Sequence, residues 1–340
     1  MEDRLKKFFK GKVVLVAGGT GSIGSELVRR ILTYPVKQVR ILSRDEFKQF
    51  NMQLELNKYP LGKVTFLIGD IRDKDRVFLA MEGVDIVFNA AAMKHVHLCE
   101  SNPFEAVKTN VLGTQNMVEA ARAVNAERFV QISTDKAALP ANVMGATKLL
   151  CEKITITAER YKGSRRTIFS AVRFGNVFGS RGSVAPLFFK QIKNGGPVTL
   201  TDKQMTRFIM RIPDAVDLVL KAAVLSKGGE LFILKMPVVR IEDLARAMID
   251  VIAPRFDRDP KKIKIKEIGK RRGEKNCELL MIEEEAEDAL ENEEMFCLSQ
   301  TAPDGFAKCT RRDYQSDKCE SFSYKELIRF VKKYYDDEKY

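Results

Sequence analysis

Three side chains of complementary acid–base chemistry stand in a row after a buried apolar run. Arg128–Ser133 has the branched, apolar character of a strand, and Thr134, Asp135 and Lys136 belong to the turn that follows it. A hydroxyl, a carboxylate and an amine can exchange protons with a bound substrate, and neighbouring charges in a cleft shift one another's pKa values. We therefore predict a catalytic set here; the alternative is a polar loop at the end of a strand.

A second candidate pair lies in the helical segment Asn142–Arg160. Met144 and Lys148 are four positions apart, so their side chains share one face of the helix. The spacing resembles the Tyr-x-x-x-Lys pair of short-chain dehydrogenases/reductases, in which the lysine holds the nicotinamide ribose and lowers the pKa of the tyrosine. The thioether of Met144 carries no proton to transfer. Either the chain is inactive, or the acid–base set after Ser133 deprotonates the substrate hydroxyl instead.

A glycine-rich turn near the N-terminus predicts a dinucleotide site. It joins a short apolar strand, Lys12–Ala17, to the helical segment Ser22–Thr33. Glycines in such a turn let backbone N–H groups approach a pyrophosphate at the positive end of a helix. The alternative is a turn of structural importance only. The cofactor contacts predicted from this turn are Gly18, Thr20, Gly21, Ser22, Ile23 and Gly24.

The ends of the next strands carry the remaining predicted cofactor contacts. An acidic residue after the second strand normally binds a ribose hydroxyl, whereas a basic one accepts a 2′-phosphate. Arg44 and Lys48 therefore favour NADP, while Asp45 leaves NAD possible. Small residues after the fourth strand let the backbone come close to the cofactor. The further predicted contacts are Ser43, Asp70, Ile71, Ala90, Ala91, Ala92 and Asn110.

Apolar strands alternate with helical segments through the first half of the chain. This order predicts an α/β fold with a Rossmann-type, doubly wound parallel sheet, covered by helices on both faces. After Gly175, glycine- and proline-rich pieces predict loops and a smaller α/β cap for the substrate. We expect residues 1–175 to form the nucleotide-binding domain, with 214–235 returning to it. Residues 176–213 and 236–340 would then form the cap. The expected strands are Lys12–Ala17, Gln38–Ser43, Val64–Ile68, Asp85–Asn89, Arg128–Ser133, Ile168–Phe174 and Glu230–Leu234. The expected helices are Ser22–Thr33, Glu46–Asn57, Asp73–Met81, Pro103–Val124, Asn142–Arg160 and Pro213–Ser226.

Composition narrows the class of protein and its partners. The 340 residues carry a net charge of +12, and 45% of them are apolar. The basic residues are spread along the chain without interleaved aromatic clusters, which favours a phosphate-bearing small substrate over nucleic acid. No stretch approaches eighteen apolar residues, and no signal peptide is evident, so we predict a cytoplasmic location without a membrane partner.

The cysteines and histidines give little support to a metal site. The six cysteines form no CxxC pair, so neither zinc nor disulfides are expected. His95, His97 and Cys99 stand at alternating positions, yet no fourth ligand lies near them in the sequence. We therefore predict no metal.

Several of these motifs occur together in one known family. The chain closely resembles the nucleotide-sugar 4,6-dehydratases of the polysaccharide-biosynthesis group, within the extended short-chain dehydrogenase/reductase superfamily, from about Lys12 to Glu285. Members with methionine at the tyrosine position are familiar there, so the resemblance implies an active enzyme. The matching stretches are NAAAMKHVHLCESNPFEAVKTNVLGTQN, ISTDKAALPANVMGATK, VRFGNVFGSRGSV, PVTLTDKQMTRFIM and GKRRGEK.

The resemblance implies a lyase that dehydrates UDP-N-acetylglucosamine with NADP. The cofactor would take a hydride from C4, Lys136 or Asp135 would remove the C5 proton, and Asp135 would protonate the departing C6 hydroxyl. Thr134 and Lys148 would orient the C4 oxygen and the nicotinamide ribose. Relatives are usually dimers or larger, which implies a homo-oligomer, a dimer or a hexamer. Arg272 replaces the proline that the family usually has beside Arg271. The substrate-side positions implied by the match are Lys94 (also near the nicotinamide ribose), Asn176, Arg181, Val184, Thr199, Thr206, Arg207, Arg271 and Glu274.

Two other functions stay open at this point. A UDP-sugar epimerase acting at C4 or C5 would use the same cofactor, although a C4 epimerase typically needs the tyrosine that Met144 replaces. A non-catalytic dinucleotide sensor would have no use for acid–base groups, and the set Thr134, Asp135 and Lys136 counts against it.

Overall fold

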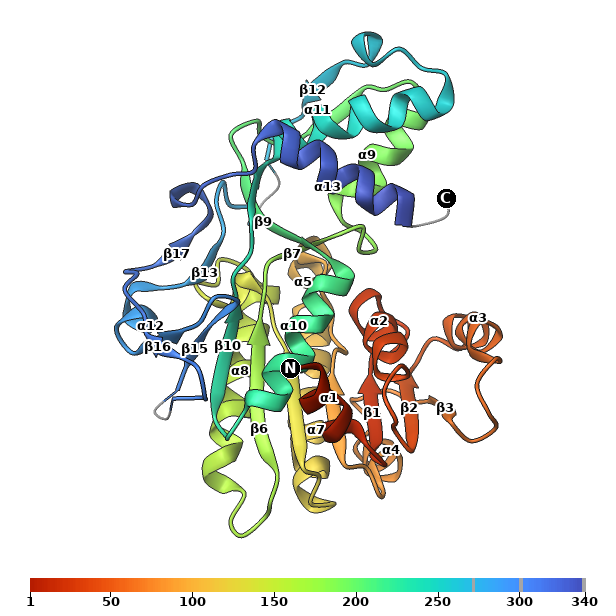
Figure 1. The fold of residues 1–340 in the computed structure, drawn as a ribbon, viewed down its shortest axis with the longest axis vertical. Helices are drawn as coiled ribbons and strands as arrows, with labels where there is room; N and C mark the ends of the chain where they lie inside the picture. Colours follow the sequence, from red (N-terminus) through yellow and green to blue (C-terminus); the bar gives the residue numbers. More distant parts are fainter. Residues whose placement is uncertain (271–272, 300–301, 338–340) are drawn as a thin grey trace.

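The apolar runs of the first half form one parallel sheet. The computed structural model describes residues 1–270, 273–299 and 302–337. Its main sheet has the strand order β16-β14-β15-β10-β6-β5-β4-β1-β2-β3, and the seven strands from β10 to β3 run parallel. This arrangement confirms the predicted Rossmann-type α/β fold (Figure 1). The parallel strands are β1 (Val13–Ala17), β2 (Gln38–Ser43), β3 (Val64–Ile68), β4 (Ile86–Asn89), β5 (Arg128–Ile132), β6 (Ile168–Arg173) and β10 (Glu230–Leu234).

Both faces of the central strands are buried, which explains why these strands are mostly apolar. In β1, Val14 and Val16 belong to one core cluster, whereas Val13 and Leu15 belong to the cluster on the other face. Helices α1, α2 and α10 contact one another on the first side, and α4, α7 and α8 on the second. These helices are α1 (Glu2–Phe9), α2 (Ser22–Ile31), α10 (Ile212–Leu225), α4 (Lys74–Met81), α7 (Gly113–Ala123) and α8 (Val143–Tyr161).

Most helix predictions agree with the structure to within one to three residues. Helix α5 (Val96–Ser101) was not predicted, and two other features of this half were not predicted either. Helix α1 precedes the first strand, and the predicted helix Pro103–Val124 is divided by a π-helical turn, η1 (Val107–Leu112), between α6 (Pro103–Ala106) and α7. The turn buries the side chain of Asn110, one of the predicted cofactor contacts. Two further helices complete this half: α3 (Glu46–Leu56) and α5 (Val96–Ser101).

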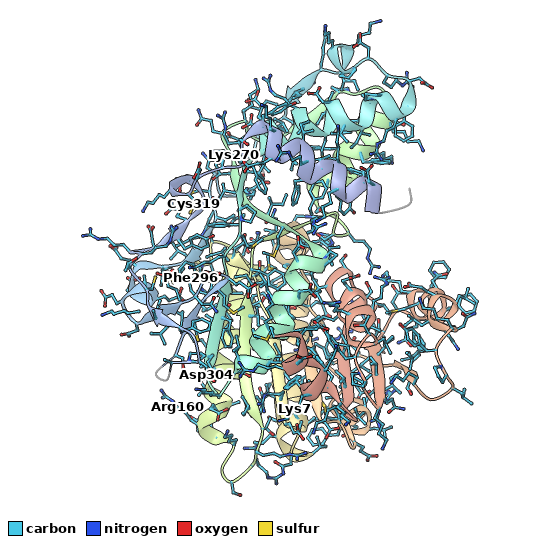
Figure 2. The ribbon with its side chains drawn as sticks, in the orientation of Figure 1. Lys7, Arg160, Lys270, Phe296, Asp304 and Cys319 are labelled. Carbon is cyan, nitrogen blue, oxygen red and sulfur yellow. The ribbon has the colours of Figure 1, made fainter. Side chains whose placement is uncertain are left out.

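The C-terminal part of the chain extends the main sheet. The predicted return of the strand at Glu230–Leu234 is confirmed, because β10 pairs with β6. Its other edge would expose unpaired backbone groups, and β15 (Met295–Leu298) covers it in antiparallel pairing. Strands β14 (Ala289–Glu291) and β16 (Ala307–Lys308) follow. Figure 2 shows Phe296 and Cys319 on this C-terminal side of the sheet.

Residues 236–340 were expected to lie in the cap, but β14, β15 and β16 of this range lie in the main sheet. The division of the chain into domains stays a prediction.

A smaller lobe lies above the carboxyl ends of the parallel strands (Figure 1). It has its own apolar core, which includes Phe178, Phe188, Met248 and Leu327. A three-stranded sheet of β7, β9 and β11 leads into it. Within the described ranges, none of the helices has the length and apolar character needed to cross a membrane. The elements of this part are β7 (Asn176–Phe178), α9 (Val184–Lys193), β8 (Val198–Leu200), β9 (Thr206–Arg211), β11 (Val238–Arg240), α11 (Ile241–Ile252), η3 (Ala253–Phe256), η4 (Pro260–Lys262), β12 (Ile265–Glu267) and α13 (Tyr324–Asp337). Between them lie β13 (Leu279–Met281), α12 (Glu283–Glu287), β17 (Tyr314–Gln315) and η5 (Ser316–Lys318).

Candidate active site

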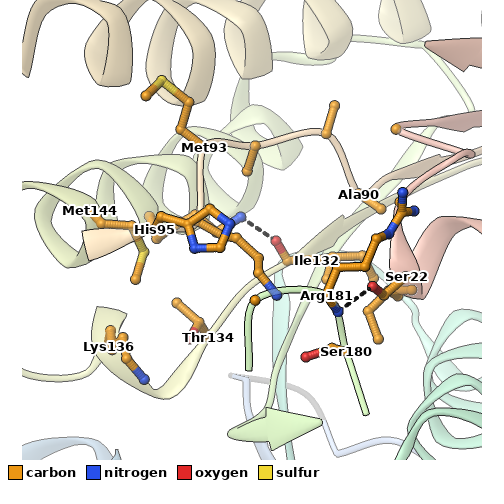
Figure 3. A pocket seen from close by; sticks show the side chains of 18 of the residues that line it. Ser22, Ala90, Met93, His95, Ile132, Thr134, Lys136, Met144, Ser180 and Arg181 are labelled. Carbon is orange, nitrogen blue, oxygen red and sulfur yellow. Dashed lines mark hydrogen bonds between the residues drawn. The ribbon is translucent and has the colours of Figure 1, made fainter. Parts of the chain in front are cut away.

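One large cavity lies where the parallel strands end, beneath the smaller lobe. Its volume is about 850 Å³, and its lining combines the glycine-rich turn, the ends of β2, β4 and β5, helix α8 and the segment that precedes β13. Carboxyl ends of parallel strands are where such sheets bind ligands. Figure 3 shows Thr134 and Lys136 on one side of this cavity, Met144 and His95 beside them, and Arg181 reaching toward Ser22.

The glycine-rich turn has the shape of a cradle for phosphate. Gly18 has a φ of +70°, and a Cβ there would lie 2.7 Å from the backbone nitrogen of Ala91. A Cβ on Gly24 would lie 2.2 Å from the carbonyl oxygen of Gly18. Helix α2 begins directly after Gly21. The backbone therefore needs glycine at both positions, and the N-terminus of α2 faces the cavity where an anion would be stabilised.

The end of β2 presents both charges that were weighed for cofactor choice. Asp45 caps α3 by accepting a hydrogen bond from the backbone nitrogen of Lys48 at 3.0 Å, and it forms an ion pair with the Lys48 amine. Arg44 is exposed and lies 3.6 Å from Asp70. Burial disfavours the charge of Asp70, but hydrogen bonds from Arg72 outweigh it and lower the pKa of that carboxyl. The carboxylate of Asp45 is thus already bound to Lys48, whereas the side chain of Arg44 stays accessible from solvent.

The residues after β4 approach the glycine turn, and a buried amide fixes their path. Asn110 accepts a hydrogen bond from the Met93 nitrogen at 2.8 Å and donates to the Met93 carbonyl at 3.1 Å. It also donates to Thr147 on α8 at 2.9 Å. Ala90, Ala91 and Ala92 line the cavity, but Asn110 is fully buried and does not. Asn110 therefore holds the cavity wall; that it touches a cofactor stays a prediction.

The predicted acid–base set forms a compact hydrogen-bonded group after β5. Thr134 donates to Asp135 at 2.7 Å, and the Lys136 amine donates to the same carboxylate oxygen at 3.0 Å. The second oxygen of Asp135 is buried without a hydrogen-bond partner. Thr134 and Lys136 line the cavity, whereas the side chain of Asp135 is fully buried behind them.

A fourth member of this group escaped the sequence analysis. Glu278 lines the cavity, is 4% exposed, and places a carboxylate oxygen 3.4 Å from the Lys136 amine. Burial opposes the charge of Lys136, but Asp135 and Glu278 together raise the pKa of the amine. Glu278 follows the GKRRGEK stretch by three residues, and that proximity was the only signal in the sequence.

Arg207 organises the loop that carries Glu278. Its guanidinium donates to the carbonyls of Lys275 and Asn276 at 2.7 and 3.0 Å, and its Nε lies 3.7 Å from Glu278. The side chain lines the cavity but is almost fully buried. Most of its donors are therefore directed to the protein.

Met144 and Lys148 lie on one face of α8, as expected, and both line the cavity. The Lys148 amine donates to the carbonyl of Ile132 at 2.5 Å. Burial lowers the pKa of this amine. Met144 packs against Met93 and Val96, so it fills the tyrosine position with an apolar side chain.

Two basic side chains extend along the cavity from other segments. Arg181, in the loop after β7, donates through its backbone nitrogen to Ser22 at 3.0 Å and through its side chain to the Thr20 carbonyl. Lys94 lies nearby, and partial burial together with the charges of Arg181 and Lys136 lowers its pKa. The smaller lobe thus contacts the glycine turn directly.

The predicted substrate-side residues divide into two groups. Asn176, Arg181, Arg207 and Glu274 line the cavity, and so do His95, Ser133 and Asn142, which were not assigned to the site. Three predicted residues are absent from its described lining, and each has a place elsewhere. Val184 begins α9, Thr199 accepts from Gln191 at 2.7 Å, and Thr206 shares a hydrogen bond with Ser316 at 2.7 Å. Arg271 lies outside the described residues.

No metal centre is evident in the part of the chain that the structure describes. Residues 1–270, 273–299 and 302–337 contain no group of three or more His, Cys, Asp or Glu side chains that could hold an ion.

Comparison with known proteins places this fold and site in a class. A protein of Methanocaldococcus jannaschii, named as an uncharacterized membrane protein, is 56% identical over 305 residues, which are 90% of this chain and 91% of the relative. A UDP-glucose 4-epimerase of Rickettsia conorii is 44% identical over 281 residues, 82% of this chain and 80% of the relative. These relatives and the site together define an extended short-chain dehydrogenase/reductase of the nucleotide-sugar dehydratase or epimerase type.

The family and the solved structures agree with this class. The chain belongs to the polysaccharide biosynthesis protein family, whose model matches residues 14–300. Pen from Bacillus thuringiensis has a structure with a TM-score of 0.90 and 46% identity, covering 95% of this chain and 98% of Pen. A dTDP-glucose 4,6-dehydratase from Streptomyces venezuelae, solved with NAD, shares the fold at a TM-score of 0.69 and 22% identity, covering 77% of this chain and 86% of that chain.

Proposed function

We propose that this chain is a nucleotide-sugar 4,6-dehydratase that acts on UDP-N-acetylglucosamine with NADP. The observation that carries the proposal is the grouping of Thr134, Asp135 and Lys136 at the same cavity as the glycine turn, with Met144 in the tyrosine position. A dehydratase must move a proton at C5 and another at the C6 oxygen, and this group supplies titratable side chains for both. A simple dehydrogenase would need neither.

The residues present fit a nicotinamide dinucleotide. Gly18 and Gly24 let the turn pack tightly against neighbouring backbone, and the N-terminus of α2 faces the cavity beside this turn. Lys148 stands where a buried amine can hold the nicotinamide ribose. The bound nicotinamide would accept a hydride from C4 of the sugar and return it to C6. Arg44 is accessible for a 2′-phosphate, which favours NADP. NAD, which the Streptomyces venezuelae fold neighbour binds, is the alternative cofactor.

The acid–base group would move two protons in each turnover, and it would take the first from the C4 hydroxyl as the hydride leaves C4. Once C4 is a ketone, the C5 proton becomes acidic, and the Asp135–Lys136 pair takes it. The same pair would give one proton to the C6 hydroxyl as its C–O bond breaks, so one water leaves, and would return the other to C5 when the hydride adds to C6. Thr134 orients the C4 oxygen. Since Asp135 is buried behind Lys136, protons reach it through its two hydrogen-bonded neighbours.

The pyrophosphate of the substrate requires basic groups on the side of the smaller lobe. Arg181 and Lys94 extend along the cavity, and their positive charges suit the two phosphates. Arg271 and Glu274 remain proposed substrate contacts through the resemblance to the family. We also propose a homo-oligomer in the cytoplasm on the same basis.

A UDP-sugar epimerase is the second candidate. The observation that favours it is the name of the Rickettsia conorii relative, at 44% identity. Met144 opposes a C4 epimerase that relies on a tyrosine, but an epimerase acting at C5 could use Lys136. The two reactions differ in whether the sugar keeps its C6 hydroxyl.

Incubation with UDP-N-acetylglucosamine and NADP in D₂O, followed by proton NMR, tests the proposal. A new C6 methyl signal with loss of one water supports the dehydratase, and the coupling at C5 gives the stereochemistry. An intact C6 hydroxyl with changed configuration supports the epimerase. Absence of any change with all UDP-sugars tried would contradict both enzymes and favour a dinucleotide sensor.

A further inference from the structure

Glu278 is a second carboxylate on the candidate catalytic lysine, and it comes from a distant part of the chain. Its side chain is 6% exposed, lines the cavity and lies 3.4 Å from the Lys136 amine. Asp135 contacts the same amine at 3.0 Å. Lys136 is therefore held between two carboxylates, of which only Glu278 faces the cavity.

The C-terminal segment fixes the position of Glu278. The hydroxyl of Ser316 accepts a hydrogen bond from the Glu278 nitrogen at 2.9 Å, and the Ser316 nitrogen donates to the Glu278 carbonyl at 2.9 Å. The same hydroxyl shares a hydrogen bond with Thr206 at 2.7 Å. Ser316 is fully buried and lies beyond residues 14–300, the part that the family model matches. The C-terminal segment thus contributes to the site through one serine.

We propose that Glu278, anchored by Ser316, is a positioning residue that holds the Lys136 amine at the cavity and sets its protonation. The role in turnover rests on the proposed function; the effect on Lys136 does not. A carboxylate at this distance favours the ammonium form, and its removal lets the amine lose a proton at lower pH. The other charged groups that face the pair are Asp135, Lys94 and Arg207.

The first test measures Lys136 itself and needs no turnover. In protein with ¹³C-labelled lysine, the Lys136 side-chain signal is assigned by its loss in Lys136→Arg, and its titration is followed by NMR. In Glu278→Gln the midpoint moves to lower pH; Glu278→Asp, which keeps the charge, stays nearer to wild type. Glu284→Gln, an exposed glutamate on α12, leaves the titration unchanged. Identical titrations in wild type and a folded Glu278→Gln overturn the proposal.

The second test follows the reaction. In Glu278→Gln, kcat falls by roughly 10- to 100-fold because a misplaced amine reacts poorly, while KM changes little. The limb of the kcat–pH profile that reports loss of the proton from the Lys136 amine moves to lower pH. Ser316→Ala produces a smaller change in the same direction. If the wild-type enzyme turns over no UDP-sugar, the proposed function fails, yet the NMR titration still decides the role of Glu278. A loss of kcat in Glu278→Gln without any shift of the profile also overturns the proposal.

Discussion

The two halves of the candidate active site are built in opposite ways. The dinucleotide cradle is made of backbone from one short turn, in which Gly18 and Gly24 allow backbone segments to pack more closely than any side chain would permit. The acid–base group is made of side chains from three distant segments, which meet at Lys136, Arg207 and Glu278. A backbone site depends on local conformation, whereas a side-chain site depends on tertiary packing. Substitutions should therefore affect binding in the first region and catalysis in the second.

The largest effect should come from removing the amine at the centre of the acid–base group. Lys136→Met should lower kcat by roughly 10²- to 10⁴-fold, because proton transfer by a positioned side chain contributes that much. Cofactor affinity should stay near that of the wild type, since the cradle is untouched. Steady-state kinetics and a cofactor titration measure both. Lys153→Met, at an exposed lysine on α8, is the control. Near-normal kcat in Lys136→Met would remove the amine from the mechanism.

The next effect concerns a buried ion group that joins the main sheet to the C-terminal segment. Arg173 is fully buried and pairs with Glu152 and Glu285, each at 2.7 Å. Burial opposes its charge, but the two carboxylates raise the pKa of the guanidinium further. Arg173→Met should lower the free energy of unfolding by about 3–5 kcal/mol, because it leaves buried carboxylates unpaired.

Urea denaturation measures this loss, and Arg166 supplies the matched control. Arg166 forms ion pairs at the surface, 3.4 Å from Glu127, with a half-exposed side chain. Arg166→Met should change stability little, as exposed pairs usually do. Equal losses of unfolding free energy in the two variants would contradict the stabilising role of the buried ion pairs of Arg173 with Glu152 and Glu285.

A smaller effect is expected at the cradle. Gly18→Ala places a Cβ 2.7 Å from the Ala91 nitrogen at a φ of +70°, so the turn must shift, at a cost of about 1–3 kcal/mol. Cofactor affinity should fall by a corresponding factor, measured by fluorescence titration. Gly62→Ala is the control, because Gly62 has a φ of +81° but no atom within 4 Å of the added Cβ. Retention of cofactor affinity in Gly18→Ala would mean that the turn adapts to the added Cβ. That result would contradict the claim that cofactor binding depends on the backbone conformation of this turn.

The smallest effect should appear in the choice of cofactor. Arg44→Ala should lower the affinity for NADP by roughly 10-fold, since one charge-assisted hydrogen bond to the 2′-phosphate is lost. The affinity for NAD, which lacks that phosphate, serves as the internal control and should not fall. Calorimetric titration with each dinucleotide measures the ratio. An equal loss for both would show that Arg44 does not read the phosphate.

Local patterns in the sequence determined most of the fold and one half of the site. The parallel sheet, its strands and the glycine turn were predicted, because burial on both faces favours apolar strands and the turn is contiguous, whereas the order of the strands came from the structure. Thr134, Asp135 and Lys136 were found for the same reason, since they follow one strand directly. Helix α1 was missed although Leu5 and Phe9 give it an apolar face, and the π-helical turn η1 was missed because it interrupts a continuous helical pattern.

Only the tertiary structure decided how distant side chains meet. In the folded protein, Asp135 is buried behind Lys136 and Glu278 lines the cavity. The hydroxyl of Ser316 accepts a hydrogen bond from the Glu278 nitrogen. The tertiary structure also sends Thr206 and Thr199 to contacts outside the cavity lining, although both lie in a stretch that matches the family. These positions depend on how the smaller lobe and the C-terminal strands pack. Such packing joins residues that are far apart in the sequence, so the spacing of residues along the chain does not predict it.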